Sequence, residues 1–289
     1  MHTHRPVLTG LLAMAVLLLP GTAGAQSPSA PAVPGSPAPS VAASPGASSI
    51  ASAAPIARLR YEVVARRPHD SSAWTQGLLF DADGRLFEGT GITGESSVRE
   101  LDPVTGAVLR STLTPDGMYG EGLALVGDRA LVQITWQDGV ATMYDKESFT
   151  VLDTFRYSGQ GWGLCFDGRR LVMSDGTGTL TFRDPATFAV LGTVEVTAGR
   201  QPVIDLNELE CVDGAVWANL WETDWIVRID PVTGAVTGAL DTTGLLVPHP
   251  RERVAGAWPN GIAKVPGTDT WLLTGKLWPQ MIEVRITEG

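Results

Sequence analysis

A single glutamate stands between two glycines in the segment Tyr119-Gly120-Glu121-Gly122-Leu123. Similar segments recur along the chain, and each has a polar or aromatic residue at the place of Glu121. These residues are Gln76, Trp162, Asn207 and Asn260. If the strands that they open meet at a common axis, the side chains meet there too, and Glu121 is the only acid among them. A carboxylate in such surroundings is suited to general acid–base catalysis once burial raises its pKa.

Further candidate side chains stand at the ends of the strands that follow. In each repeat an Asp-Gly-type turn joins two strands into a hairpin, so the start of the first strand and the end of the second lie on one face. The end positions are Gly91, Trp136, Gly176, Trp221 and Lys276. We therefore predict a pocket with Glu121 as the catalytic residue. The predicted binding residues around it are Gln76, Trp136, Trp162, Asn207, Trp221 and Lys276.

Each candidate also has a purely structural interpretation. The three tryptophans are large enough to pack between repeats. Lys276 could equally be an ordinary surface charge, and Glu121 a solvated carboxylate at the rim. The glycines beside Glu121 favour close backbone approach over a random surface position. Glu88 is a secondary candidate, but its deeper place in a strand favours a structural hydrogen-bonding role.

The sequence offers little for metal or cofactor chemistry. Beyond the first 25 residues the only histidines are His69 and His249, and neither belongs to a ligand-spaced cluster. No HExxH, CxxC or Gly-x-Ser-x-Gly motif is present. We expect no metal and no cofactor. The formal net charge of −10 argues against nucleic acid or anionic lipid as a partner.

Internal repeats determine the predicted fold. The repeated unit is a strand, a turn, a second strand, a loop and a third strand that ends near an Asp-Pro and Thr-Gly turn, as in Leu101–Gly106 and Ile229–Gly234. The repeats are spaced by roughly 40 to 50 residues, which is typical of a four-stranded propeller blade. We predict an all-β, five-bladed β-propeller in which the N-terminal strand near residues 59–66 completes the last blade. A closed ring leaves no free sheet edge, so we expect a monomer.

The N-terminal region predicts export. Residues 1–25 have a short apolar core, Leu8 to Leu19, and a small-residue cleavage site near Ala25, as in a secretory signal peptide; a retained anchor is the alternative. Residues 26–57 are rich in Pro, Ala and Ser and carry no charge, which predicts a flexible linker before the domain at 58–289. The mature protein is expected to be periplasmic or secreted, without a stable membrane anchor.

Two cysteines occupy equivalent positions in successive repeats. Cys165 lies in Gly163–Gly168 and Cys211 in Leu209–Gly214. Innermost strands of neighbouring blades approach one another, and an exported protein meets oxidising conditions. A disulfide and a pair of buried thiols are both consistent with this pattern.

These motifs resemble the plant and bacterial glutaminyl-peptide cyclotransferases, a family of five-bladed propellers, from about Trp74 to Trp278. The matching segments are Thr75–Leu78, Gly94–Arg99, Gly120–Leu123, Gly161–Leu164, Leu206–Glu210, Trp217–Asp224 and Thr274–Pro279. The resemblance implies metal-free cyclisation of N-terminal glutamine, on peptides or proteins, to pyroglutamate with loss of ammonia, and it implies that Glu121 is essential. Trp74 and Tyr119 stand where phenylalanine is common in the family and are expected to keep an aromatic wall.

Two other functions are considered on the same residues. A metal-dependent lactonase-like propeller hydrolase would need several carboxylates at the axis, where the aligned strand starts provide only Glu121. A non-catalytic exported propeller would use the tryptophans as a recognition cage for peptides or cell-wall material.

Overall fold

Short antiparallel strands make up nearly all the regular structure of the domain. The computed structural model describes residues 55–246 and 254–289. Within those residues the only helical segment is a 3-10 turn, η1 (Pro115–Gly117). The all-β prediction is therefore confirmed.

Three sheets have four strands each, hydrogen-bonded in chain order. The first contains β2 (Thr75–Phe80), β3 (Leu86–Thr90), β4 (Ser97–Leu101) and β5 (Val108–Leu113). The second contains β6 (Gly120–Val126), β7 (Ala130–Thr135), β8 (Val140–Asp145) and β9 (Val151–Arg156). The third contains β10 (Leu164–Phe166), β11 (Leu171–Met173), β12 (Thr179–Arg183) and β13 (Val190–Glu195). Each sheet is thus one repeat of the sequence pattern.

The remaining long strands form one eight-stranded sheet in the order β16-β17-β18-β19-β1-β22-β21-β20. One half contains β16 (Leu206–Val212), β17 (Ala215–Leu220), β18 (Trp225–Ile229) and β19 (Val236–Asp241). The other half contains β1 (Ala57–Pro68), β22 (Gln280–Glu288), β21 (Thr270–Gly275) and β20 (Pro259–Lys264). The halves join through a short parallel pairing of β1 with β19. A separate small sheet pairs β14 (Thr197–Ala198) with β15 (Gln201–Pro202).

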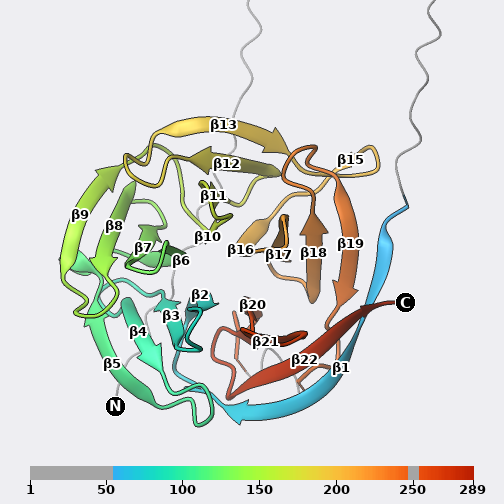
Figure 1. The fold of residues 1–289 in the computed structure, drawn as a ribbon, viewed down its shortest axis with the longest axis horizontal. Helices are drawn as coiled ribbons and strands as arrows, with labels where there is room; N and C mark the ends of the chain where they lie inside the picture. The colour runs from blue at the N-terminus through green and yellow to red at the C-terminus, as the bar shows by residue number, and fades with distance from the viewer. Residues whose placement is uncertain (1–54, 247–253) are drawn as a thin grey trace, which may run out of the picture. The chain divides into compact units, whose positions relative to one another are not determined.

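The two ends of the domain pair with each other. Strand β1 runs antiparallel to β22, from Leu59 opposite Glu288 to Pro68 opposite Gln280. This is the pairing expected for the N-terminal strand and the last repeat. In Figure 1 the first strands of the repeats, β2, β6, β10, β16 and β20, surround a common centre, and β5, β9, β13 and β19 lie at the periphery.

The Asp-Pro turns between third and fourth strands are held by the aspartate side chain. Asp102 Oδ1 accepts hydrogen bonds from the backbone N–H groups of Val104 (2.9 Å) and Thr105 (2.7 Å). Asp230 Oδ1 accepts the N–H of Val232 at 2.8 Å in the matching turn. These aspartates bond the local backbone two or three residues on, which explains why the motif recurs at this point of the repeat.

Close packing at the centre explains a repeated glycine. A Cβ atom added to Gly122 of β6 would lie 2.4 Å from the backbone nitrogen of Leu164 on β10. The N–H of Gly122 donates to the carbonyl of Trp162 at 2.8 Å. Two strands that belong to different sheets are therefore in direct backbone contact, which a side chain at this position would prevent.

Some predictions concern residues that the structure describes only in part. The signal peptide at 1–25 and most of the linker at 26–57 lie outside the described residues; β1 begins at Ala57, the last residue assigned to the linker. Within the described ranges, no helix combines the length and apolar character that crossing a bilayer requires.

Strands β5, β9 and β13 end their sheets among the described residues, so free sheet edges do exist. The sheets are not edgeless as expected for a closed ring, and that expectation was wrong.

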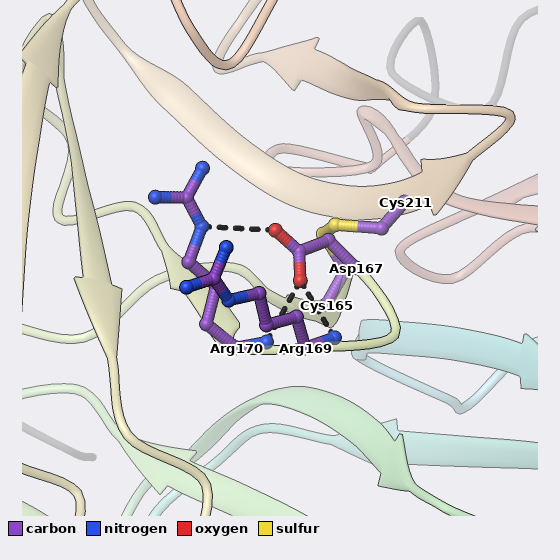
Figure 2. Close-up of a disulfide and its surroundings, with 5 residues drawn as sticks. All are labelled: Cys165, Asp167, Arg169, Arg170 and Cys211. Atoms are coloured by element: carbon purple, nitrogen blue, oxygen red, sulfur yellow. Dashed lines mark hydrogen bonds and ion pairs between the residues drawn. A yellow bond between two sulfur atoms is a disulfide. The ribbon is translucent and has the colours of Figure 1, made fainter.

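A disulfide joins two of the central strands. Cys165 of β10 and Cys211 of β16 are bonded, with their Cα atoms 5.5 Å apart. Figure 2 shows the bond above the turn in which Asp167 accepts the N–H groups of Arg169 and Arg170 at 3.0 and 2.7 Å. Of the two interpretations left open by the sequence, the structure has the disulfide.

Removing this disulfide is expected to destabilise the domain but to leave the residues of the pocket in place. The bond closes a loop with a sequence separation of 46 residues. Replacing both cysteines with alanine should lower the free energy of unfolding by about 2–4 kcal/mol, because the unfolded chain regains freedom. Urea denaturation under non-reducing conditions measures this. Reductant should destabilise the wild type and leave the double variant unchanged; an unaltered midpoint in the variant would contradict the prediction.

Candidate functional site

Irregular pairing at the starts of the central strands places the candidate side chains. The β6–β7 register shifts between Gly120 and Leu123, the stretch that contains Glu121. Equivalent shifts occur around Gln76 on β2, Asn207 on β16 and Asn260 on β20. A bulge turns side chains out of the regular ladder. The repeated position recognised in the sequence is therefore a repeated departure from regular strand geometry.

A cavity of about 250 Å³ lies at the strand starts that carry Glu121 and Asn207. It is lined by Trp74, Tyr119, Glu121, Trp136, Trp162, Asn207, Trp221 and Lys276. All eight are among the predicted site residues. Gln76, the remaining predicted binding residue, is buried behind Glu121 and is not part of the lining.

Glu121 is held by a relay of amides. Its side chain accepts a hydrogen bond at Oε1 from Gln76 Nε2 at 2.8 Å. Asn260 Nδ2 in turn donates to Gln76 Oε1 at 3.0 Å and to the Thr75 carbonyl at 2.9 Å. Asn260 thereby fixes the orientation of the Gln76 amide, with its NH₂ group toward Glu121. Both polar atoms of the Gln76 amide are hydrogen-bonded, Nε2 to Glu121 and Oε1 to Asn260. Gln76 therefore positions the Glu121 carboxyl group directly.

Burial moves the pKa values of Glu121 and Lys276 toward each other. Desolvation raises the pKa of Glu121 well above its ordinary value, and the positive charge of Lys276 opposes this shift. Desolvation lowers the pKa of Lys276 to about 8, opposed by Glu121. Among the described residues no carboxylate lies close enough to Lys276 to form an ion pair. The site therefore holds a carboxyl group whose pKa is raised by burial and an ammonium group whose pKa is lowered by burial.

Aromatic rings form the walls of the cavity. The rings of Tyr119 and Trp136 have centroids 5.6 Å apart, and those of Trp162 and Trp221 are 5.9 Å apart in an edge-to-face arrangement. Lys276 Nζ lies 4.0 Å from the Trp221 centroid and 5.5 Å from that of Trp74. These distances are within the range of cation–π attraction. The ammonium group is thus held by indole faces.

Glycine at one strand-end position makes room for an indole. A Cβ atom on Gly176, whose φ is +82°, would lie 2.6 Å from the ring of Trp162. A residue other than glycine would displace that ring. Gly176 and Trp162 therefore occupy strand-end and strand-start positions of the same repeat and depend on each other sterically.

Asn207 leaves an acceptor unused in the pocket. Its side chain is buried, and its Oδ1 atom has no hydrogen-bond partner among the described residues. A buried carbonyl oxygen without a partner costs free energy. A ligand with an N–H group in the cavity would remove that cost.

Glu88 belongs to a separate network behind the pocket. It bonds to His69 Nε2 at 3.0 Å, Thr75 Oγ1 at 2.6 Å and Arg99 Nε at 2.8 Å. Burial acts to raise the pKa of Glu88, but the charges and hydrogen bonds of His69, Arg99 and Thr75 lower it to about 2. A carboxylate held ionised in this way is a poor proton shuttle. The network supports the structural interpretation, and His69 extends it to the Trp278 carbonyl near Lys276.

The sequence did not reveal a second buried acid at the centre. Glu208 accepts the backbone N–H groups of Leu78 at 3.2 Å and Ile262 at 2.9 Å, and so ties three central strands together. Burial raises its pKa well above the ordinary value, and the charge of Glu210 adds to this. Its neighbour Asn207 is the residue that aligns with Glu121 in the repeats. At the position of Glu208 the other repeats have no acid, so the alignment did not single it out.

The donor set of the cavity does not suit a metal-dependent hydrolase. Its lining includes one carboxylate and no histidine or cysteine. Across the described residues, no group of three or more His, Cys, Asp or Glu side chains is arranged to hold a metal ion. A hard divalent cation needs several oxygen ligands, which this lining does not supply.

Known proteins resemble this chain in sequence and structure over most of the domain. The sequence profile of the glutamine cyclotransferase family matches residues 38–286. A glutaminyl-peptide cyclotransferase of Arabidopsis thaliana is 38% identical over 232 residues, which are 79% of this chain and 72% of the relative. The crystal structure of Myxococcus xanthus glutaminyl cyclase superposes with a TM-score of 0.75 and 36% identity, and covers 81% of this chain and 99% of that one.

The fold and the site define an all-β protein with one buried carboxylate in an aromatic pocket. The match to the family profile spans nearly the whole domain and contains every residue of the cavity. The chain belongs to the glutamine cyclotransferase family. The resemblance seen in the sequence motifs is confirmed.

Proposed function

We propose that this protein is a glutaminyl-peptide cyclotransferase that converts the N-terminal glutamine of peptides or proteins to pyroglutamate and releases ammonia. The observation that carries the proposal is the buried carboxylate of Glu121, the one carboxylate in the lining of an aromatic cavity that it shares with Lys276. Membership of the glutamine cyclotransferase family and the similarity to the Arabidopsis enzyme support it.

Glu121 would transfer the proton that the reaction must move. The α-amino nitrogen attacks the γ-carboxamide carbon, forming the ring C–N bond, and loses a proton to the Glu121 carboxylate. The bond to the amide nitrogen then breaks as the same proton passes from Glu121 to that nitrogen, which leaves as ammonia. A carboxyl group with a raised pKa can accept and return a proton within one turnover.

Lys276 and Asn207 are placed to act on the substrate itself. The ammonium of Lys276 would stabilise the negative charge that develops on the carboxamide oxygen. The unpartnered Oδ1 of Asn207 would accept an N–H of the α-amino group and hold its lone pair toward the carbon. The indoles would confine the glutamine side chain in a folded conformation, which matters because both reacting groups belong to one residue.

The substrate and the absence of a metal can be tested together. The purified protein should convert a Gln-led dipeptide to a product lighter by one ammonia in mass spectrometry, with EDTA leaving the rate unchanged. The same dipeptide led by asparagine should not react. A rate no higher than the spontaneous rate in buffer would overturn the proposal.

The domain fold proposed for this activity is a five-bladed β-propeller. Each four-stranded sheet would be one blade, and the eight-stranded sheet would be two blades joined by the β1–β19 pairing. The arrangement of β2, β6, β10, β16 and β20 around one centre supports this (Figure 1). The N-terminal strand β1 would complete the last blade.

Export and a monomeric state are part of the same proposal. The apolar segment and small-residue site at 1–25, the linker at 26–57 and the Cys165–Cys211 disulfide support a periplasmic or secreted protein. The edge strands β5, β9 and β13 are only six residues long each, which limits pairing between molecules.

A further inference from the structure

The aromatic wall of the cavity has one polar link. Around the pocket, Tyr119 contacts Trp136, Trp162 contacts Trp221, and Lys276 lies between Trp221 and Trp74. Trp136 and Trp162 form no ring–ring contact in the described part of the chain. At this point a hydrogen-bonded side chain links the two indoles from outside the cavity lining.

That side chain belongs to Gln160, in the loop between β9 and β10. Its Oε1 atom accepts the indole N–H of Trp136 at 2.8 Å and that of Trp162 at 2.9 Å. An indole nitrogen can only donate, so the atom between the two rings must be the amide oxygen. One oxygen therefore links two indoles from neighbouring repeats, one directly after β7 and one just before β10.

Trp136 depends on this bond more than the other aromatic residues do. The residue is 38% exposed, and Tyr119 is the aromatic ring that it contacts in the described part of the chain. Trp162 is packed more firmly, against Gly176 and Trp221. The bond to Gln160 thus links a partly exposed ring to one that has more packing contacts.

We propose that Gln160 is a positioning residue for the cyclisation: it holds Trp136 and Trp162 as a rigid clamp against the substrate's glutamine side chain. This inference rests on the proposed function. Gln160 does not line the cavity and acts through the two indoles. Because a clamp accelerates the reaction by restricting the substrate to reactive conformations, the effect falls mainly on kcat.

The decisive variants differ in whether they keep the acceptor. Gln160→Leu removes the oxygen at similar size, Gln160→Glu keeps an oxygen that accepts both N–H groups, and Gln137→Leu makes the same change at an exposed glutamine next to Trp136. With a Gln-led dipeptide, Gln160→Leu should lose about 10-fold in kcat with less than about 2-fold change in KM. Gln160→Glu should recover kcat to within about 3-fold, and Gln137→Leu should match the wild type.

A second measurement tests the link without any turnover. In ¹⁵N spectra of the indole N–H groups of the nine tryptophans, Gln160→Leu should shift two resonances, those of Trp136 and Trp162, and Gln160→Glu should retain their hydrogen-bonded character. Wild-type kcat in Gln160→Leu, or equal losses in the Leu and Glu variants, would overturn the inference. A wild type that fails to cyclise the dipeptide would instead contradict the proposed function, and the spectra would still report on the link.

Discussion

Replacing Glu121 with glutamine is expected to lower kcat by about 10²–10⁴-fold, the usual contribution of a positioned acid–base group. The amide that replaces the carboxyl has the same shape and can still accept the hydrogen bond from Gln76 Nε2. It cannot take a proton from the α-amino group or return one to the leaving nitrogen. The pocket should therefore bind substrate and fail to turn it over.

Steady-state kinetics on a Gln-led dipeptide, with binding of a non-reactive analogue measured by calorimetry, separates the two effects. We expect the dissociation constant of the analogue to stay within about 3-fold of the wild type, since the aromatic walls are unchanged. Glu222→Gln is the matched control, because Glu222 is an exposed carboxylate directly after the pocket residue Trp221. Activity of Glu121→Gln within tenfold of the wild type would show that another group moves the proton.

The position of Glu121 in the pocket was predictable because the repeats fix which strand ends share a face. A hairpin returns to the face from which it started, so the strand starts at Glu121 and Trp162 and the strand ends at Trp136 and Lys276 had to meet there. No detail of side-chain packing was needed for this step. The cavity lining agrees with that argument.

The hydrogen bonds that hold those residues were not predictable in the same way. Asn260 was aligned with Glu121 in the sequence. Its role in orienting Gln76 depends on the local geometry of bulges, which the repeat pattern does not predict. Gln160 lies in a loop outside the aligned positions, so no repeat signal marks it. Alignment gives the face on which a side chain lies, whereas bulges and loops decide which atom it contacts.

Lys276→Met is expected to reduce kcat by about 10²–10³-fold, comparable to the loss of an oxyanion donor. Methionine keeps the apolar stem between Trp74 and Trp221 and removes the ammonium. The pH profile of kcat gives a more specific signature than the rate loss. In the wild type, kcat should rise as Glu121 loses its proton and fall as the pH passes about 8, where Lys276 loses its own.

Both limbs of that profile should change in Lys276→Met, in defined directions. The falling limb near pH 8 should disappear, because the group that titrates there is gone. The rising limb should move to higher pH, because Lys276 opposes the upward shift of the Glu121 pKa and its removal lets that pKa rise further. Lys264→Met is the control, since Lys264 Nζ lies 5.4 Å from the Trp271 ring, outside the cavity. A falling limb that persists in Lys276→Met would assign that titration to another group and remove Lys276 from the chemistry.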